Sequence, residues 1–538
     1  MSPEYFFIYI FVLGNTVIAI YFNDSVEITL PQGKVKGSKS RVKNYQYFLG
    51  IPYASVKRRF EEPGEPPTWN GTFHANQGTI TCIQYFTPLG LPIGQEDCLV
   101  LNIFTPLNLD AKPHPVIVFI HGGGLYWGSN LYLIYDPRFL VKKNVIVVTV
   151  NYRLGAFGFL CLNHKEAPGN VGLKDQIAAL KWIQKNISYF GGDPNSVTLF
   201  GQSAGAAAVN YLLLSNSAKG LFHRVIMHSG TVLMPMAFSA NPIEPTAKVA
   251  ARLGYNTTDS DELLNIFRNA SAEDIVRASN YNSLNDVFTP HVYRPCIEKA
   301  MSNQRPLITQ HPRDLLRKTG LNIPMIIGFN DKEGIDFAGN YDLHGIEMLN
   351  KDFTSILPEN LLFNNDVDRQ LFIADVKRFY FGNSKVTING LIDYFSDIVF
   401  MYPTIATTEL LLERSNSTIY HYYFRYDSIR NLYKLISQLK FIPGANHADE
   451  LFYLFDPVVY QVLPNIPRDA KIIELLTNLW TSFARTGKPV DTQITWEQDE
   501  EQLKFLEIGK EVKMINMPNK KRIEFWKKAY YKYGMKKG

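Results

Sequence analysis

The stretch "VTLFGQSAGAAAVNYLLL", residues 197–214, decides the fold because a serine between two glycines separates two different apolar patterns. Its first residues are β-branched and aromatic and predict a strand, whereas residues 204–214 are rich in alanine and leucine and predict a helix. Ser203 of this G-x-S-x-G pattern therefore lies at a sharp strand-to-helix turn, where a serine hydroxyl can stand clear of a sheet as a nucleophile. The pattern itself arises by chance in roughly one chain in six of this length, so its context carries the inference.

Further apolar runs on both sides of this stretch predict a parallel sheet. They are β-branched, lack polar alternation and span residues 115–120, 145–150, 196–200, 224–229 and 323–329. Such runs are typical of parallel strands that are covered on both faces. Between them, one helical face is predicted by the spacing of Leu173, Ile177, Leu180, Ile183 and Ile187. The chain is therefore predicted to be an α/β protein with a large, mostly parallel central sheet and helices on both faces.

Composition indicates a globular chain with a large core: 538 residues are 46% hydrophobic and 20% charged. No linker-like, repetitive or low-complexity stretch divides it, so residues 20–538 are predicted to form one domain. The net charge of +5 is concentrated in residues 519–538, where eight Lys or Arg face one Glu. The helical spacing of Ile523, Trp526 and Tyr530 favours a surface helix docked by its aromatics over a nucleic-acid- or lipid-binding tail.

The first residues predict a signal peptide. Residues 6–22 are apolar and contain Val17-Ile18-Ala19, so residues 1–19 are expected to be removed and the protein to be secreted. The leader carries Glu4 and no Lys or Arg, which leaves open a cytoplasmic chain with a buried first segment. No later apolar run is long enough for a membrane span, and the C-terminus lacks a lipid-anchor signal. Candidate glycosylation sequons begin at Asn23, Asn70, Asn186, Asn256, Asn269 and Asn416.

The chain has four cysteines, Cys82, Cys98, Cys161 and Cys296, which allow three pairings. In a secretory compartment we expect Cys82 to bond to Cys98, closing a short loop that stabilises the fold by roughly 3 kcal/mol. Cys161 lies in the apolar "GFLCL" and is interpreted as a small buried hydrophobic residue. The state of Cys296 stays open.

A glycine-rich loop after a predicted strand supplies candidates for an oxyanion hole. "HGGG", residues 121–124, follows the strand predicted at 115–120. Backbone N–H groups of Gly123, Gly124 and Ala204 are therefore predicted to face the negative charge that develops when the serine attacks a carbonyl.

A serine hydroxyl also needs a base and an orienting acid. His447 lies in the loop "FIPGANHADELFY" just before a helical pattern, which is where a catalytic histidine is expected. Glu333 follows a strand in "MIIGFNDKEG", with Asp331 as the alternative acid. The chain order serine, acid, histidine agrees with a strand–turn–helix serine hydrolase.

Together these stretches resemble a type B carboxylesterase, the α/β-hydrolase family that includes cholinesterases and insect esterases. The resemblance extends over nearly the whole chain. The stretches that carry it are "YFLGIPYA", "RRFEEP", "EDCLVLNIFTP", "VFIHGGG", "NYRLGAFGFL", "APGNVGLKDQIAALKWIQKNI", "FGGDPNSVTLFGQSAG", "KGLFHRVIMHSG", "GFNDKEG" and "GANHADEL". The resemblance implies an α/β-hydrolase fold and a serine carboxylic-ester hydrolase that works through an acyl-enzyme.

By this resemblance Ser203, Glu333 and His447 are the catalytic triad. The resemblance also implies the oxyanion hole Gly123, Gly124 and Ala204, the disulfide Cys82–Cys98, a supporting hydrogen-bond role for Ser229, and the ion pairs Arg59–Glu96 and Arg153–Asp193. The chemistry moves protons between side chains and an ester, so neither a metal nor an organic cofactor is expected. The expected partner is a small-molecule ester, whereas no nucleic acid and no membrane span are expected.

Departures from the family pattern bear on the substrate. Gln202 stands beside the serine where the family commonly has Glu, and the loop between Cys82 and Cys98 lacks the tryptophan expected of a cholinesterase. Without that cation–π surface and that charge, choline esters are poor candidates.

Small to medium apolar esters are therefore the predicted substrates. The GQSAG form resembles juvenile-hormone esterases of insects as well as general insect esterases, so a dedicated hormone or pheromone esterase is an alternative. A second alternative is an ester-sequestering or adhesion-type binding protein with little turnover. Leu125, Tyr126 and Trp127, just past the glycine loop, are candidates to shape the pocket entrance.

Overall fold

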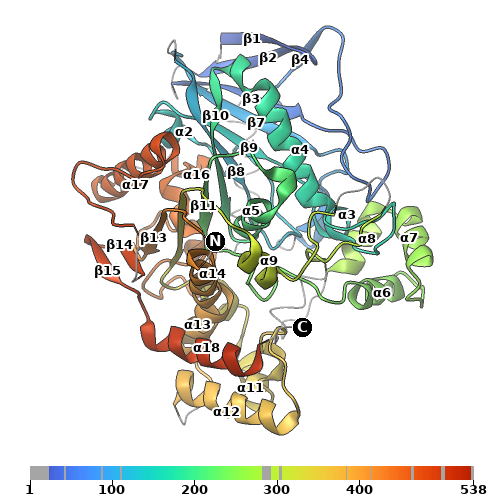
Figure 1. Cartoon of the computed structure of the whole chain (residues 1–538), viewed down its shortest axis with the longest axis vertical. Helices are drawn as coiled ribbons and strands as arrows, with labels where there is room; N and C mark the ends of the chain where they lie inside the picture. Colours follow the sequence, from blue (N-terminus) through green and yellow to red (C-terminus); the bar gives the residue numbers. More distant parts are fainter. Residues whose placement is uncertain are drawn as a thin grey trace.

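Strands from both ends of the chain lie in one central sheet with helices around it (Figure 1). The computed structural model describes residues 24–40, 44–86, 89–109, 112–280, 293–301, 306–382, 385–413, 415–461, 466–498 and 503–534. The predicted signal peptide, residues 1–19, and the sequon at Asn23 lie outside these residues.

Thirteen strands of the described residues form this sheet. Its order is β1 (Asp24–Leu30), β2 (Gly33–Ser40), β3 (Tyr45–Pro52), β7 (Val100–Pro106), β9 (Ile146–Val150), β8 (His114–Ile120), β10 (Gly192–Gln202), β11 (Arg224–His228), β12 (Met325–Asn330), β13 (Ile419–Phe424), β14 (Lys504–Ile508) and β15 (Val512–Asn516), while β4 (Thr72–His74) pairs with β2. From β9 to β14 all neighbours are parallel, and the two flanks are antiparallel except for the parallel pair of β2 and β4. The five predicted parallel strands are confirmed, and β10 lies between β8 and β11.

Both faces of the sheet are covered, as the continuous apolar runs predict. Along β8, Val116, Val118 and Ile120 join the core beneath α4 (Val171–Asn186) and α5 (Ala204–Leu214). The alternate residues Ile117 and Phe119 join a second core that includes α17 (Pro467–Thr486). Because side chains alternate along a strand, only a sheet with two buried faces needs apolar residues at every position.

The C-terminal helix α18 (Lys520–Tyr533) docks by its aromatic face, as the sequence predicts. Ile523, Trp526 and Tyr530 are buried in a third core that includes Phe372 and Phe400. None of the described helices combines the length and the apolar composition needed to cross a lipid bilayer.

Two disulfides are present in the described part of the chain. Cys82 is bonded to Cys98, as expected. Cys161 is buried, as its apolar surroundings predict, and it is bonded to Cys296 across 135 residues. Apolar surroundings do not reveal a disulfide partner that only the fold brings near.

One of the two ion pairs implied by the resemblance is confirmed, and the other is corrected. Arg59 contacts Glu96 at 2.6 Å. Arg153 pairs instead with Asp175, at 2.6 Å between Nη2 and Oδ1, and both side chains are buried. Asp193 lies at the start of β10, where its Oδ1 accepts a hydrogen bond from the Asn195 backbone. A buried guanidinium needs a buried carboxylate, and α4 supplies Asp175 from inside the core.

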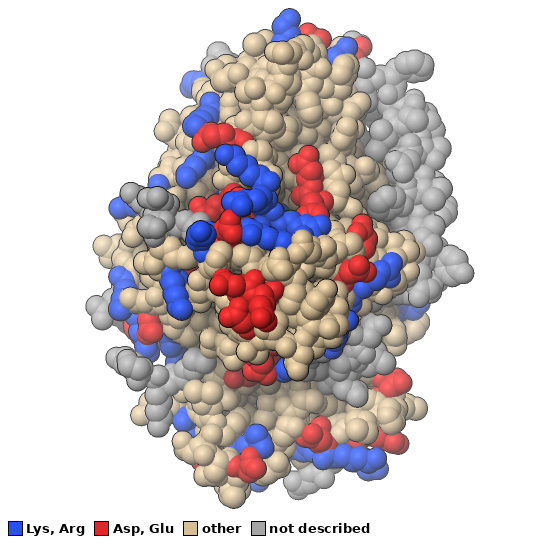
Figure 2. Space-filling view, turned by 90° about the vertical axis from the view of Figure 1, so that its right-hand side faces the viewer, with Lys and Arg blue, Asp and Glu red and all other residues tan. Residues whose placement is uncertain are grey.

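The side of the molecule that carries α7 (Ser260–Asn269) faces the viewer in Figure 2 and shows basic and acidic side chains next to one another. Among the described residues, Glu166 contacts both Arg58 and Arg268. The described side chains in this view mix both signs of charge and do not form a single-sign patch.

The sequons differ in exposure. Asn70, Asn256, Asn269 and Asn416 are exposed. Asn186, by contrast, is 5% exposed, and its side-chain amide donates to the carbonyl of Trp182 at 2.9 Å. This packing makes Asn186 less accessible to a glycan than the four exposed sequons, and all of them stay predictions.

Candidate active site

Ser203 forms a strained turn between β10 and α5. Its backbone has φ 57° and ψ −127°, which a residue with a side chain rarely adopts. Glycine is required on both sides: a Cβ on Gly201 would lie 2.3 Å from the Gly205 carbonyl oxygen, and one on Gly205 would lie 2.2 Å from that of Ile120. The Ser203 N–H donates to the His228 carbonyl at 2.8 Å. The turn predicted from the sequence is thus present and holds Ser203 at the start of a helix.

The glycine loop after β8 packs directly against this turn. A Cβ on Gly122 would lie 2.9 Å from the Ser203 Cβ, so only glycine permits this approach. Gly123 and Gly124 have φ values of 98° and 60°, which turn the loop around the serine. Ala204 is the first residue of α5, so its N–H belongs to the positive end of that helix. The three predicted oxyanion donors therefore belong to two segments that meet at Ser203.

His121, at the start of the loop, is a buried structural residue. Its ring stacks on Tyr152 with centroids 4.5 Å apart, and its Nδ1 lies 2.8 Å from the Gly122 carbonyl oxygen. Burial lowers the pKa of His121 to about 4, which keeps the ring neutral at physiological pH.

His447 and Glu333, predicted from two distant loops, lie together. His447 Nδ1 is 2.6 Å from Glu333 Oε2, and the Glu333 side chain is fully buried. The other oxygen, Oε1, accepts hydrogen bonds from the Ser229 hydroxyl at 2.5 Å and from the Asn330 backbone at 2.7 Å. Both carboxylate oxygens are therefore engaged, and the edge of the carboxylate that faces the imidazole is held in place.

Asp331, the alternative acid, has a different position. Its Oδ1 accepts a hydrogen bond from the Ala445 backbone at 2.7 Å, two residues before His447. Burial raises the pKa of Asp331 to about 6. Asp331 supports the loop that carries the histidine, whereas Glu333 contacts the imidazole.

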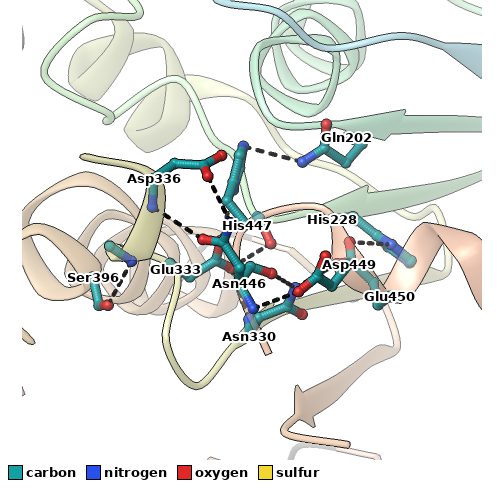
Figure 3. Close-up of polar contacts among 12 residues, drawn as sticks. Gln202, His228, Asn330, Glu333, Asp336, Ser396, Asn446, His447, Asp449 and Glu450 are labelled. Atoms are coloured by element: carbon teal, nitrogen blue, oxygen red, sulfur yellow. Dashed lines mark hydrogen bonds and ion pairs between the residues drawn. The ribbon is translucent and has the colours of Figure 1, made fainter. Parts of the chain in front are cut away.

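Further carboxylates, which no sequence motif predicted, surround this pair (Figure 3). Burial of His447 lowers its pKa, but the charge and hydrogen bond of Glu333 and the charges of Asp336 and Glu450 outweigh it, so the pKa is raised. Asp336 accepts a hydrogen bond from the Asn446 side chain at 2.7 Å, and burial raises its own pKa to about 6. The imidazole thus lies in a strongly acidic environment.

A second buried histidine–glutamate pair, His228 and Glu450, lies at the end of β11. His228 Nδ1 is 3.0 Å from Glu450 Oε1, and the Trp480 indole donates to His228 Nε2 at 2.9 Å. Glu450 Oε2 accepts from the Asn330 side chain, which also donates to the Asn446 carbonyl at 2.7 Å. This network joins the end of β11 to the loops of Glu333 and His447. In the sequence, only the position of His228 inside the apolar run 224–229 indicates a buried polar partner.

Gln202 contacts the opposite edge of the imidazole. Its amide nitrogen lies 3.1 Å from His447 Nε2, as Figure 3 shows. An amide N–H is a donor, so this contact requires an unprotonated Nε2 and favours the tautomer with its proton on Nδ1, facing Glu333. The imidazole is thereby oriented with Nε2 toward the Ser203 turn.

Comparisons of sequence show the family of the chain. A family model described as the carboxylesterase family matches residues 24–526. The chain is 36% identical over 468 residues to esterase FE4 of Myzus persicae, which covers 83% of this chain and 81% of that protein. It is 33% identical over 491 residues to the juvenile hormone esterase of Tribolium castaneum, covering 85% of this chain and 83% of that protein.

A comparison of structures gives the same family. The crystal structure of juvenile hormone esterase from Manduca sexta, with OTFP covalently attached, matches with a TM-score of 0.84 and 28% identity, covering 94% of this chain and 100% of that one. The chain therefore has the α/β-hydrolase fold, belongs to the carboxylesterase family and is a carboxylic ester hydrolase.

Proposed function

We propose that the protein hydrolyses esters through an acyl-enzyme on Ser203, with His447 as the general base and Glu333 as the acid that orients it. The observation that carries this proposal is the 2.6 Å contact between His447 Nδ1 and Glu333 Oε2. It leaves Nε2 as the nitrogen that takes a proton, on the edge contacted by Gln202, the neighbour of Ser203.

Acylation then proceeds in two steps. The Gln202 amide first gives up its contact with His447 Nε2, which takes the Ser203 proton as Oγ bonds to the ester carbonyl carbon. The oxyanion accepts hydrogen bonds from the N–H groups of Gly123, Gly124 and Ala204, each worth roughly 3 to 4 kcal/mol. When the tetrahedral intermediate collapses, the alcohol leaves with the proton from Nε2.

Deacylation repeats the same steps with water. His447 Nε2 takes a proton from water as its oxygen bonds to the acyl carbon, and the proton passes to Ser203 Oγ as the acid leaves. The carboxylates around His447 stabilise the imidazolium in both half-reactions. The sequence of steps consumes one water and yields one alcohol and one acid.

Small to medium apolar esters are the proposed substrates. Support comes from the residues next to the glycine loop: Leu125 is buried, and Tyr126 lines a recess together with Phe157 and Ile275. At about 40 Å³ this recess is only water-sized, but the apolar residues around it favour apolar over charged ester groups.

A juvenile-hormone or pheromone esterase is the second candidate, supported by the similarity to two proteins named juvenile hormone esterase. The ratio of kcat/KM for juvenile hormone to kcat/KM for 1-naphthyl acetate distinguishes the candidates. A general esterase favours the naphthyl ester, whereas a dedicated enzyme strongly favours the hormone.

The first experiment compares steady-state hydrolysis of 4-nitrophenyl acetate by the wild type, Ser203→Ala and the control Ser217→Ala. Ser217 is exposed in η3 (Asn216–Ala218), the short helix that follows α5, so its loss should leave turnover unchanged. We expect Ser203→Ala to abolish turnover while keeping the wild-type circular dichroism spectrum. Unchanged hydrolysis in folded Ser203→Ala would exclude the proposed nucleophile. A single stoichiometric burst in the wild type would instead indicate an ester-sequestering protein.

Secretion is proposed as well, supported by the two disulfides and by the exposed sequons at Asn70, Asn256, Asn269 and Asn416. Expression of the full chain in insect cells tests it. We expect active protein in the medium, a mature N-terminus near residue 20 and a mass decrease on glycosidase treatment. Activity confined to the cell lysate would contradict the proposal.

A further inference from the structure

A π-helical segment, η5 (Ser396–Met401), lies between α13 (Ile388–Phe395) and α14 (Tyr402–Leu412). The local sequence explains it in part: Pro403 has no N–H to donate to the Val399 carbonyl, so the ordinary α-helical bond cannot form there. π-helical turns are rare, and they occur frequently at functional sites.

The first residue of η5 contacts the loop of Glu333. The Ser396 hydroxyl accepts a hydrogen bond from the Gly334 backbone at 2.9 Å and donates to the Ile392 carbonyl at 2.7 Å. Gly334 directly follows Glu333, and a Cβ there would lie 2.2 Å from the Ile392 carbonyl oxygen. This close backbone packing joins η5 to the residue after the acid.

The fifth residue of η5 covers the imidazole. The ring of Phe400 stacks on that of His447, with centroids 4.3 Å apart and planes inclined by 26°. Phe400 is itself only 1% exposed. Glu333 holds one edge of the imidazole, Gln202 contacts the other, and Phe400 covers a face, so the ring is restrained in three directions.

Helix α18 anchors the same segment from the far side. Arg522 contacts Asp397 of η5 at 3.2 Å and Asp393 of α13 at 2.7 Å. Asp393 also contacts Lys332, the neighbour of Glu333, at 2.9 Å. The buried Asp397 accepts a hydrogen bond from Tyr380 at 2.5 Å. These ion pairs fix the position of η5 relative to α13 and α18, and they thereby keep the Phe400 ring against the site.

We propose that Phe400 is a positioning residue for His447, presented by η5 so that the imidazole keeps the orientation needed for proton transfer with Ser203. This inference rests on the proposed role of His447 as the general base. A stacked aromatic restricts rotation of the imidazole about its side-chain bonds, and misplacement of a base by a fraction of an ångström lowers the rate without altering substrate binding.

The pH dependence of kcat/KM distinguishes a positioning role of Phe400 from a purely structural one, because loss of packing alone would not shift it. The charged groups that face His447 are Glu333, Asp336 and Glu450, whose charges outweigh burial and raise its pKa, while Gln202 is neutral. Without Phe400 the imidazole becomes free to leave these carboxylates. Its pKa then moves down toward the ordinary value of a histidine, and the acidic limb of kcat/KM moves to lower pH.

The test compares Phe400→Leu with the matched control Phe395→Leu. Phe395 is equally buried and one turn earlier, where its ring contacts are with Phe337, Tyr341 and Tyr394. We expect Phe400→Leu to lower kcat about three- to tenfold with KM unchanged, from the loss of one aromatic contact. It should also move the acidic limb to lower pH. Phe395→Leu should lower Tm to a similar extent and leave both kcat and the limb unchanged.

Equal kcat and an equal acidic limb in Phe400→Leu and wild type would overturn the inference. The same holds if Phe395→Leu reproduced the full effect. Phe400→Met, whose unbranched side chain adapts to an irregular cavity without supplying a ring, keeps the test available should Phe400→Leu unfold. Ser203→Ala is measured in parallel: if it retained turnover, the proposed function would fail, whereas its inactivity together with an unaffected Phe400→Leu would reject only the role of Phe400.

Discussion

The Ser229 hydroxyl donates to Glu333 Oε1 at 2.5 Å, on the carboxylate whose other oxygen faces His447. The first prediction follows from this bond. Because Glu333 is fully buried, Ser229→Ala leaves its charge with one donor fewer and should lower the free energy of unfolding by about 1.5 to 3 kcal/mol. A less stabilised Glu333 charge attracts the imidazolium proton more strongly, so the acidic limb of kcat/KM should move to higher pH.

Urea unfolding and a pH–rate profile of Ser229→Ala check this prediction, with the exposed Ser217→Ala as control. A profile that superposes on that of the wild type would show that Ser229 does not act on Glu333.

Gln202→Glu changes the charge on the open edge of the imidazole. A carboxylate at the position of the amide, now 3.1 Å from His447 Nε2, stabilises the imidazolium and raises its pKa further. We expect the acidic limb to move to higher pH and turnover to recover at alkaline pH. Gln202→Met, which removes the amide without adding charge, is the control. An unshifted limb in Gln202→Glu would mean that the amide does not lie against Nε2 in solution.

The raised pKa of Asp336, beside the site, should make the unfolding free energy depend on pH. Burial raises the pKa of its carboxyl to about 6, so the folded protein binds this proton more tightly than the unfolded chain does. The unfolding free energy therefore falls as pH rises from about 4 to about 6, and Asp336→Asn removes that loss. The unfolding free energy of Asp336→Asn minus that of wild type should therefore be larger near pH 7 than near pH 4, by on the order of 1 kcal/mol.

Urea unfolding at both pH values measures this difference, and the exposed Asp366→Asn serves as control. The same substitution removes one of the charges that raise the pKa of His447, so the acidic limb should move to lower pH. An unchanged stability difference between the two pH values would contradict the prediction.

The two disulfides should differ in their contribution to stability. The chain-entropy model gives about 5 kcal/mol for the loop of 135 residues between Cys161 and Cys296, and about 3 kcal/mol for the 16 residues between Cys82 and Cys98. Each pair replaced by alanine, followed by urea unfolding, tests the order. Mass spectrometry of the alkylated wild type should find no free thiol. Alkylation at Cys161 would refute that bond.

Much of the site was predictable because its main elements follow local rules. The turn at Ser203 needs glycine at positions 201 and 205, and both are visible in the sequence. Glu333 and His447 follow a strand and precede a helical pattern, respectively, where side chains of this type are expected. The five parallel strands were likewise predictable, because a strand with two buried faces leaves a continuous apolar run.

The residues that were missed act over long distances along the chain. Glu450 and His228 are 222 residues apart, and Phe400 stacks on His447 from a helical segment that carries no catalytic motif. The partner of Arg153 was missed for the same reason, because the sequence does not indicate which carboxylate is buried beside its guanidinium. The partner proved to be Asp175 rather than Asp193.

The sequence by itself determined the α/β class, the serine turn and the glycine loop, and it indicated the residues that we propose as acid and base, since periodicity and turn chemistry are properties of neighbouring residues. Tertiary structure alone decided the partner of Cys161, the carboxylates that raise the pKa of His447 and the ring that covers its imidazole. Burial, charge proximity and stacking arise only when distant segments pack together, and they set the proton affinity and orientation of a base whose position the sequence already indicates.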